Sequence, residues 1–543
     1  MRPIEKRRAA PNGVVAILVS LALAAGAGAS AEFASAETLA SAAAAATAAA
    51  TTSDLRVEAS SAQATGGGYV QVEGVISATV SRHDGSRGAY RVPVTLLYPD
   101  ASDGCNGVAV VDVLNSVFYE TFDWAGTLGD PFRPSLFPLG RAILGDGFLQ
   151  ARGYTYATVQ WNKLVLERQR GAGTLPDSTL RIDRGTDGYT ILRDLSDFLR
   201  RPTELLVGPV PSLCAARDVV AFGYSQTAML LREFHFAGRN AGLALGSSFD
   251  DGIVFEGSLH GGPGSRCRRL ADSPPWFEYT FVGCGDATPP EQGKVMTVNA
   301  ETDLQLINAW KARAKDTAAA GHYRVYELAA TAHIPTPLFP LKLAGARPAE
   351  QADQNDADTS PFYRAMMEHL RRWIGEGHPP PPDVAIAGGV KRRANGFFSD
   401  ASWGSDNGLV FITRSGKDGN ALGGVRLPHV RTALPDGADV GGPLGIYRGT
   451  HCDNDPTASD FILSCRLSGD QSIYNMAGGT FTPYAELDTD LCDDFYPTRE
   501  AYAQAVRRAA EHAAAKGWTL SEETDLIVAS AEQKAAASPG CVP

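Results

Sequence analysis

Basic residues are in short supply in this sequence. Lysine and arginine total 49 against 61 aspartates and glutamates, which gives a formal net charge of −12 over 543 residues. The first 31 residues hold four basic groups and one glutamate, so the remainder of the chain carries a charge near −15. Because this excess of negative charge repels phosphate, we do not expect nucleic acid or an anionic membrane surface as a partner.

Several ligand-binding motifs are also missing. No C-x-x-C pair occurs among the eight cysteines, which argues against a zinc site. The sequence has no G-x-x-x-x-G-K-[ST] loop and no dinucleotide fingerprint between a strand and a helix. The acidic stretch 451–460 lacks the glycine and terminal glutamate of an EF-hand loop, so we interpret it as a solvated loop. We expect neither a cofactor nor a metal.

The N-terminal apolar run, residues 14–25, is shorter than the ~20 residues that a membrane-spanning helix needs. Basic residues precede it, and the Ala-Ser-Ala of 29–31 supplies the small residues of a cleavage site. We therefore predict that residues 1–31 are a secretory signal peptide and that the protein is secreted or periplasmic. Residues 32–53 are mostly Ala, Ser and Thr, so we expect a flexible leader there.

The eight cysteines fit an exported chain, because an even number in an oxidising compartment suggests up to four disulfides. Proximity in the sequence favours Cys267 with Cys284 and Cys452 with Cys465. The other four would close longer loops; they are Cys105, Cys214, Cys492 and Cys541.

From about residue 54 to 375, strand-like runs alternate with helical ones, which is typical of an α/β fold with a mostly parallel sheet. We predict a catalytic core over 54–378, a proline-rich connector over 379–390 and a C-terminal region over 391–543. Strands are expected at 68–81, 90–98, 107–114, 154–160, 253–258, 294–299 and 323–328. Helices are expected at 188–199, 361–374 and 498–516, with a further one starting at 521.

The stretch 217–231 is typical of a buried strand, a sharp turn at Ser225 and an apolar helix. A hydroxyl at such a turn is held away from its own backbone and is placed to attack a carbonyl, with helix N–H groups beside it. The fit to G-x-S-x-G is incomplete, because Thr227 stands where the second glycine is usual.

A serine needs an imidazole to take its proton, so a histidine from another loop is required. His333 follows the strand expected at 323–328 and is the first candidate. His260 also follows an expected strand and is the rival base. The ordinary alternative for His333 is a histidine packed against the end of the sheet.

An acid must hold the imidazole in its productive tautomer. Glu301 and Asp303 follow the strand at 294–299, between the serine and the histidine in chain order. We favour Asp303, because loop length should let it reach back under His333, and we keep Glu301 as the alternative. Either carboxylate could instead stabilise the start of a helix expected at 304–314.

Two backbone N–H groups are needed for the oxyanion of the tetrahedral intermediate. One should belong to Gln226, directly after the serine. The second should come from the loop after the strand at 107–114, where Ser116 and Val117 are the candidates. An ordinary turn at the strand end is the alternative.

These stretches resemble one branch of the α/β-hydrolase superfamily, long and often exported proteins described as alpha/beta hydrolase domain proteins. The resemblance lies in the Ser-Gln pair at 225–226, the Glu-Thr-Asp of 301–303, the Glu-Leu-Ala of 327–329 before the histidine, and the Gly-Gly-Val-Arg-Leu-Pro of 423–428. It spans about residues 55–535, which implies that the C-terminal region packs on the hydrolase core. The sequence departs from the branch at two places. Thr227 replaces a glycine, and Asn115-Ser116 stands where Asn-Arg-Gly is usual.

The resemblance implies an α/β-hydrolase fold and a serine hydrolase of the carboxylic-ester type. We therefore expect an exported esterase that acts on a small-molecule or polymeric ester through an acyl-enzyme. An amidase or peptidase with the same triad is one alternative. A noncatalytic binding protein on the same fold is another.

Overall fold

The structure is a computed structural model. It describes residues 51–82, 84–100, 104–115, 138–171, 173, 177–236, 240, 254–261, 293–306, 321–333, 355, 357–392, 408–414, 419–433, 439–441, 445–448, 480–483, 496 and 498–537.

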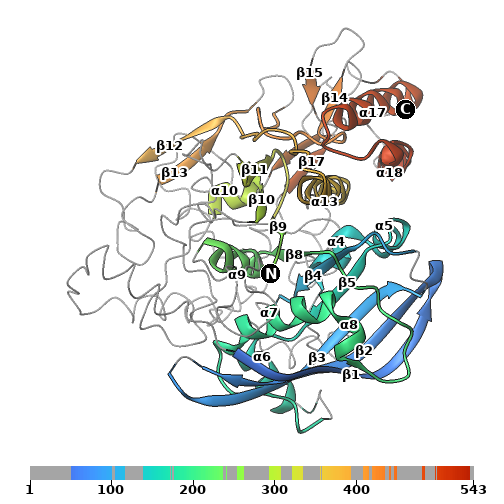
Figure 1. The fold of residues 1–543 in the computed structure, drawn as a ribbon. Coiled ribbons are helices and arrows are strands. Elements are labelled where there is room, and N and C mark those ends of the chain that lie inside the picture. Colours follow the sequence, from blue (N-terminus) through green and yellow to red (C-terminus); the bar gives the residue numbers. More distant parts are fainter. Residues whose placement is uncertain are drawn as a thin grey trace, which may run out of the picture.

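An 11-stranded sheet organises the chain (Figure 1). Its strands are β1 (Thr51–Thr65), β2 (Tyr69–Ser81), β3 (Arg87–Pro99), β4 (Val108–Val113), β5 (Thr155–Val159), β6 (Arg181–Ile182), β7 (Leu206–Val207), β8 (Asp218–Tyr224), β9 (Gly257–Gly261), β10 (Lys294–Ala300) and β11 (Tyr323–Leu328). Their spatial order is β11-β10-β9-β8-β4-β5-β3-β2-β1-β7, with β6 paired to β3.

The strands β4, β5 and β8 to β11 run parallel to one another, whereas β1, β2 and β3 pair antiparallel. Every residue of β4, β5 and β8 is buried, as expected for parallel strands covered on both faces. In β2 the buried residues largely alternate with half-buried ones, the pattern of a sheet with one face packed on the core. The parallel half therefore provides the enclosed edge at which a site can form.

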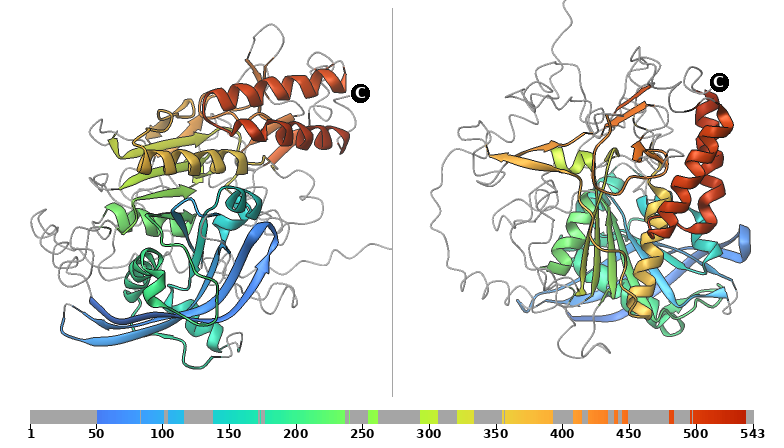
Figure 2. Two further views of the ribbon diagram at one scale, coloured as in Figure 1. Left: turned by 45° about the vertical axis from the view of Figure 1, so that its right-hand side comes forward. Right: turned by 90° about the horizontal axis from the view of Figure 1, so that it is seen from above.

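Helices cover both faces of the parallel half. The helices are α4 (Leu139–Leu144), α5 (Asp146–Ala151), α6 (Lys163–Gly171), α7 (Asp187–Arg200), α8 (Pro202–Leu205), α9 (Gln226–Phe236), α10 (Glu301–Leu306), α13 (Ser360–Gly375), α17 (Arg499–Ala515) and α18 (Thr524–Ala537), with 3-10 turns η1 (Gly66–Gly68) and η9 (Ser521–Glu523). Seen from above, α9 and α13 lie on opposite faces of the sheet (Figure 2, right).

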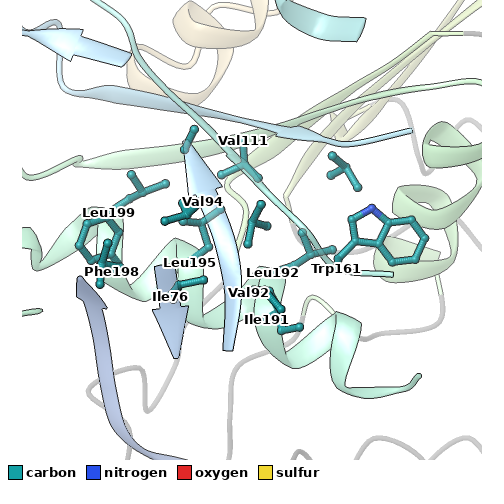
Figure 3. Close-up of a cluster of buried hydrophobic side chains, with 14 of the residues drawn as sticks. Ile76, Val92, Val94, Val111, Trp161, Ile191, Leu192, Leu195, Phe198 and Leu199 are labelled. Carbon is teal, nitrogen blue, oxygen red and sulfur yellow. The ribbon is translucent and has the colours of Figure 1, made fainter. Parts of the chain in front are cut away.

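Alternate residues of one strand supply the two cores. Val111 of β4 packs with α7 and α9, in the cluster shown in Figure 3, which joins strand residues such as Val94 to Leu195 of α7. Its neighbour Val110 points to the other face and packs with α4 and α13. This period of two is what a strand buried on both faces imposes.

The C-terminal part of the chain continues the sheet beyond β11. Val384 lies parallel beside Tyr326, and Val425 lies parallel beside Leu328. The Val425 N–H donates to the Glu327 carbonyl at 2.8 Å, and the Ala329 N–H donates to the Val425 carbonyl at 3.0 Å. The remaining strands form two-stranded pairs: β12 (Gly388–Arg392) with β13 (Gly408–Ile412), β14 (Arg431–Ala433) with β15 (Asp439–Gly441), and β16 (Gly445–Arg448) with β17 (Thr480–Pro483).

The helices α17 and α18 pack against each other near the C-terminus. Thr498 caps α17, because its hydroxyl accepts the Ala501 N–H at 3.2 Å, and Gly517 follows the helix with a φ of 77°. The Trp518 ring then lies 5.7 Å from Tyr326 and 6.2 Å from Phe362. The C-terminal helices are thereby joined to β11 and α13.

The α/β fold expected from the sequence is confirmed. Two of its details were wrong. The strand expected at 253–258 is β9, Gly257–Gly261, so His260 lies within the strand rather than after it. The strand β1 begins at Thr51, so the last three residues of the expected leader belong to the sheet. The signal peptide lies outside the described residues, and the domain boundaries near residue 379 stay a prediction.

A disulfide joins Cys105 to Cys214 across 109 residues. Each cysteine lies shortly before a strand, β4 or β8, so the disulfide is at the amino edge of the sheet. The pairs favoured by proximity, Cys267 with Cys284 and Cys452 with Cys465, lie outside the described residues. None of the helices that the structure describes is long and apolar enough to cross a membrane.

Candidate active site

Ser225 lies between β8 and α9 with a φ of 58°, in the left-handed region that non-glycine residues rarely adopt. Among the described residues only Asp54 and Ala330 share this property. The Ser225 N–H donates to the Gly261 carbonyl at the end of β9, at 2.7 Å. Such strain concentrates at functional sites, where the surroundings hold a residue in an otherwise unfavourable conformation.

Thr227 explains how the turn forms without a second motif glycine. Its hydroxyl accepts the Tyr224 N–H at 2.9 Å and lies 3.0 Å from the Tyr224 carbonyl, to which it can donate. The side chain is fully buried. At Gly223 the situation differs, because a Cβ there would lie 2.7 Å from the Thr227 carbonyl oxygen. Close approach of strand and helix therefore requires glycine at position 223, whereas position 227 accommodates a threonine.

The structure brings His333 to Ser225. The Ser225 hydroxyl and His333 Nε2 are 3.0 Å apart. Backbone contacts fix the histidine: its N–H donates to the Thr302 hydroxyl at 3.0 Å, and the Tyr224 hydroxyl donates to its carbonyl at 2.6 Å. Burial, with smaller contributions from Tyr363 and Asp303, holds the pKa of Tyr224 well above its ordinary value, so Tyr224 remains a neutral donor.

Asp303 is the carboxylate that meets the imidazole. Its Oδ1 lies 2.6 Å from His333 Nδ1, and its Oδ2 accepts the Ala300 N–H at 2.7 Å. The side chain of Asp303 is fully buried, whereas 13% of the His333 side chain is exposed. With Nδ1 donating to Asp303, Nε2 is left to accept the serine proton.

Glu301, the alternative acid, points elsewhere. Its Oε1 pairs with Arg414 Nη2 at 2.7 Å, and its Oε2 accepts the Ala330 N–H at 2.9 Å. The carboxylate is fully buried. The two carboxylates of the Glu-Thr-Asp segment thus have different partners, although both lie in the first turn of α10.

His260, the rival base, is buried inside β9 and hydrogen-bonds Ser258 at 2.7 Å. The Ser258 hydroxyl also lies 2.8 Å from Nε2 of His235. Burial lowers the pKa of His235 to about 3 and holds the pKa of His260 well below its ordinary value, with smaller contributions from His235 and Arg232. This cluster belongs to the interior between α9 and the sheet.

Gln226 is the first residue of α9, so its N–H is among those that lack a partner within the helix. The other predicted oxyanion donors, Ser116 and Val117, lie outside the described residues. Asn115, the last described residue before them, is buried and donates its side-chain amide to the Tyr224 carbonyl at 2.8 Å.

The sequence predicted no role in the site for Tyr224, Thr302 or Asn115. Each is adjacent to a residue of the site, but its contact crosses to a different strand or loop, so the sequence carries no local signal for it. In the described part of the chain, no group of three or more His, Cys, Asp and Glu side chains is arranged to hold a metal ion.

Comparison with solved structures finds esterases of low identity. Those of the fungus Rhizomucor miehei have 10% identity and a TM-score of 0.30, with 57% of this chain and 85% of that chain covered. A CE15 glucuronoyl esterase from Teredinibacter turnerae has 12% identity and a TM-score of 0.27, with 51% and 74% covered. A ferulic acid esterase from Streptomyces cinnamoneus has 14% identity and a TM-score of 0.26, with 54% and 85% covered.

No curated protein matches the sequence. A family model, described as alpha/beta hydrolase domain, matches residues 146–529. This match includes Ser225, Asp303 and His333 and covers more than half of the chain. The chain therefore belongs to the alpha/beta hydrolase domain family.

Proposed function

We propose that this protein is a serine hydrolase that cleaves carboxylic esters through an acyl-enzyme. The observation that carries the proposal is the hydrogen-bonded series Asp303–His333–Ser225, in which the serine occupies a left-handed turn between a buried strand and a helix. Membership of a hydrolase family supports it. The choice of an ester rests on the resemblance of the segments around these three residues to the exported branch of that family.

In the first half-reaction, Ser225 Oγ forms a bond to the ester carbonyl carbon while its proton passes to His333 Nε2. The carbonyl π electrons move to the oxygen, where the Gln226 N–H is placed to donate. Collapse of this intermediate breaks the bond to the alcohol oxygen, which leaves with the proton from His333. Asp303 stays ionised and stabilises the transient imidazolium.

In the second half-reaction, water attacks the acyl carbon and gives a proton to His333. The bond between the carbon and Ser225 Oγ then breaks, and the serine recovers its proton as the acid departs. Enzyme atoms and charges return to their starting state, and no outside oxidant or reductant is needed.

A fluorophosphonate probe tests the nucleophile directly. Native protein should be labelled, and Ser225→Ala should not be. Failure to label folded native protein would rule out the proposal. A panel of esters and matching amides, varied in acyl length and in the bulk of the leaving group, would then identify the preferred bond and substrate size.

Export is part of the same proposal. The basic and apolar character of residues 1–31 favours a secretory signal, and the disulfide between Cys105 and Cys214 supports an oxidising compartment. Expression of the full chain in a bacterial host should yield a protein that begins near residue 32 outside the cytoplasm. A protein retained at full length in the cytoplasm would contradict this part.

A further inference from the structure

The loop that carries His333 contains a second left-handed residue, and this one is buried. Ala330 has a φ of 61° and is fully buried two residues after the end of β11. This bend redirects the chain from the strand toward the serine. A non-glycine residue in this conformation is stable only when its neighbours fix it.

Both backbone polar groups of Ala330 are fixed by side chains. Its N–H donates to Glu301 Oε2 at 2.9 Å, and its carbonyl accepts the Asn355 side-chain amide at 2.9 Å. Glu301 also pairs with Arg414 at 2.7 Å. The carboxylate therefore joins Arg414, which follows β13, to the bend that precedes His333.

The pair is shielded from water. The side chain of Glu301 is fully buried, and that of Arg414 is 15% exposed. Nε and Nη1 of Arg414 are buried without a hydrogen-bond partner among the described residues. Separating the members of a buried pair would leave each charge uncompensated, which is energetically costly. The pairing with Arg414 therefore holds the Glu301 carboxylate in place.

We propose that Glu301 is a positioning residue that keeps His333 Nε2 within reach of Ser225. It holds the Ala330 bend through its hydrogen bond to the Ala330 N–H, and Arg414 orients the Glu301 carboxylate. This role rests on the proposed serine-hydrolase function. It also makes Arg414, far along the sequence, a contributor to catalysis through Glu301 and not through contact with the substrate.

The chain offers a matched control at the opposite edge of the sheet. Glu256, directly before β9, pairs with Arg200 and accepts the Val219 N–H at 2.6 Å. Like Glu301 it bridges an arginine and a backbone N–H, and its side chain is mostly buried, at 22% exposed. Glu256→Gln therefore has a similar structural consequence without touching the His333 loop.

The first test compares Glu301→Gln with Glu256→Gln in the full chain, with thermal unfolding measured in parallel. We expect Glu301→Gln to lower kcat, and the rate of fluorophosphonate labelling, by about 10- to 100-fold, because a small displacement of a catalytic group has an effect of this size. KM should change by less than about threefold, and Glu256→Gln should keep native kcat while losing thermal stability. Native labelling rates in both variants would overturn the positioning role and leave the proposed function intact.

The second test separates positioning from general destabilisation. Glu301→Gln removes the negative charge that pairs with Arg414 in the segment leading to His333, so the acid limb of the kcat/KM profile should move to lower pH. Arg414→Gln removes the positive charge beside Glu301, so the limb should move to higher pH. Shifts on the order of one pH unit are expected for an unpaired charge in a buried site.

The double variant Glu301→Gln/Arg414→Gln removes both charges and should return the acid limb to its native position. An acid limb at the same pH in the native protein and in all variants would overturn the positioning role. This holds even if one variant folds poorly, because Arg414→Gln and the double variant are measured independently. If the Ser225→Ala variant is labelled as fast as native protein, both proposals fall.

Discussion

In the described part of the chain, Ser225 pairs with His333 at the carboxyl edge of the sheet, and a second pair, Ser258 with His260, lies within β9, where Ser258 also contacts His235. The second pair is the shorter, at 2.7 Å against 3.0 Å. His260 is fully buried, and its Nδ1 has no hydrogen-bond partner among the described residues. His333 is partly exposed, and its Nδ1 meets Asp303.

A short serine–histidine distance does not by itself indicate a nucleophile. The Ser225–His333 pair has three features that favour catalysis. Asp303 contacts its imidazole, its serine has a left-handed φ, and its histidine is partly exposed to solvent. Burial, with smaller contributions from His235 and Arg232, also lowers the pKa of His260 and favours its neutral form.

The largest effect should come from removing one histidine or the other. His333→Ala should lower kcat for ester hydrolysis by roughly 10⁴- to 10⁶-fold, because the serine proton loses its acceptor. His260→Ala should keep kcat within about threefold of the native value when measured below the melting temperature of the variant. It should lose stability, because the substitution leaves a buried cavity. Steady-state kinetics alongside thermal unfolding decides, and the reverse pattern would make Ser258 the residue to examine.

The next effect tests the carboxylate. If the proposed function holds, Asp303→Asn should lower kcat by about 10³- to 10⁴-fold, because the amide no longer holds His333 in the productive tautomer. Glu301→Gln should have a clearly smaller effect. Equal small losses in the two variants would mean that neither carboxylate orients His333.

His235, which also contacts Ser258 of the buried pair, can be examined through the pH dependence of stability. The folded-state pKa of His235, about 3, lies below its unfolded value near 6.5, so the unfolded state binds more protons between these values. Stability is therefore fully present above about pH 6.5 and is lost as the pH falls toward 3.

Denaturant unfolding at pH 7 and pH 5 measures this loss. Native protein should lose about 2 kcal/mol more than His235→Gln over this interval, because the variant lacks the titrating group. The variant serves as the control for all other titrating groups. Identical losses would show that His235 is not buried in its neutral form.

The smallest effect concerns the serine turn itself. Thr227→Val keeps the shape of the side chain but leaves the buried Tyr224 N–H without its acceptor, so the free energy of unfolding should fall by about 1–3 kcal/mol. Thr227→Ser keeps the hydroxyl and should lose less. Thermal unfolding of the two variants tests this, and probe labelling reports on the geometry of the turn. Equal stability of the two variants would contradict a stabilising role of the Thr227 hydroxyl.

Much of the fold was accessible from the sequence because its signals are local. The strand expected at 323–328 is β11, and the cap at Thr498 and the glycine at 517 delimit α17 as predicted. The sequence also predicted that Ser225, Asp303 and His333 each follow a strand of the parallel sheet, and the carboxyl ends of such strands share one edge.

What escaped prediction depends on contacts between distant segments. The start of β9 was placed too early, because a short apolar run does not mark where pairing begins. The strand β1 is rich in small and polar residues and is stabilised by its pairing with β2. The Cys105–Cys214 disulfide spans 109 residues, and Arg414, a partner of Glu301, lies more than a hundred residues further along the chain.

The serine turn has a consequence for how related chains are recognised. Its two motif positions are unequal: Gly223 gives the helix backbone its space, whereas Thr227 contributes a hydroxyl that ties the helix to the strand end. A search pattern that requires glycine at both positions would pass over chains built in this way. A pattern of glycine first, and either glycine or a small hydroxyl residue last, follows the steric and hydrogen-bonding requirements of the turn more closely.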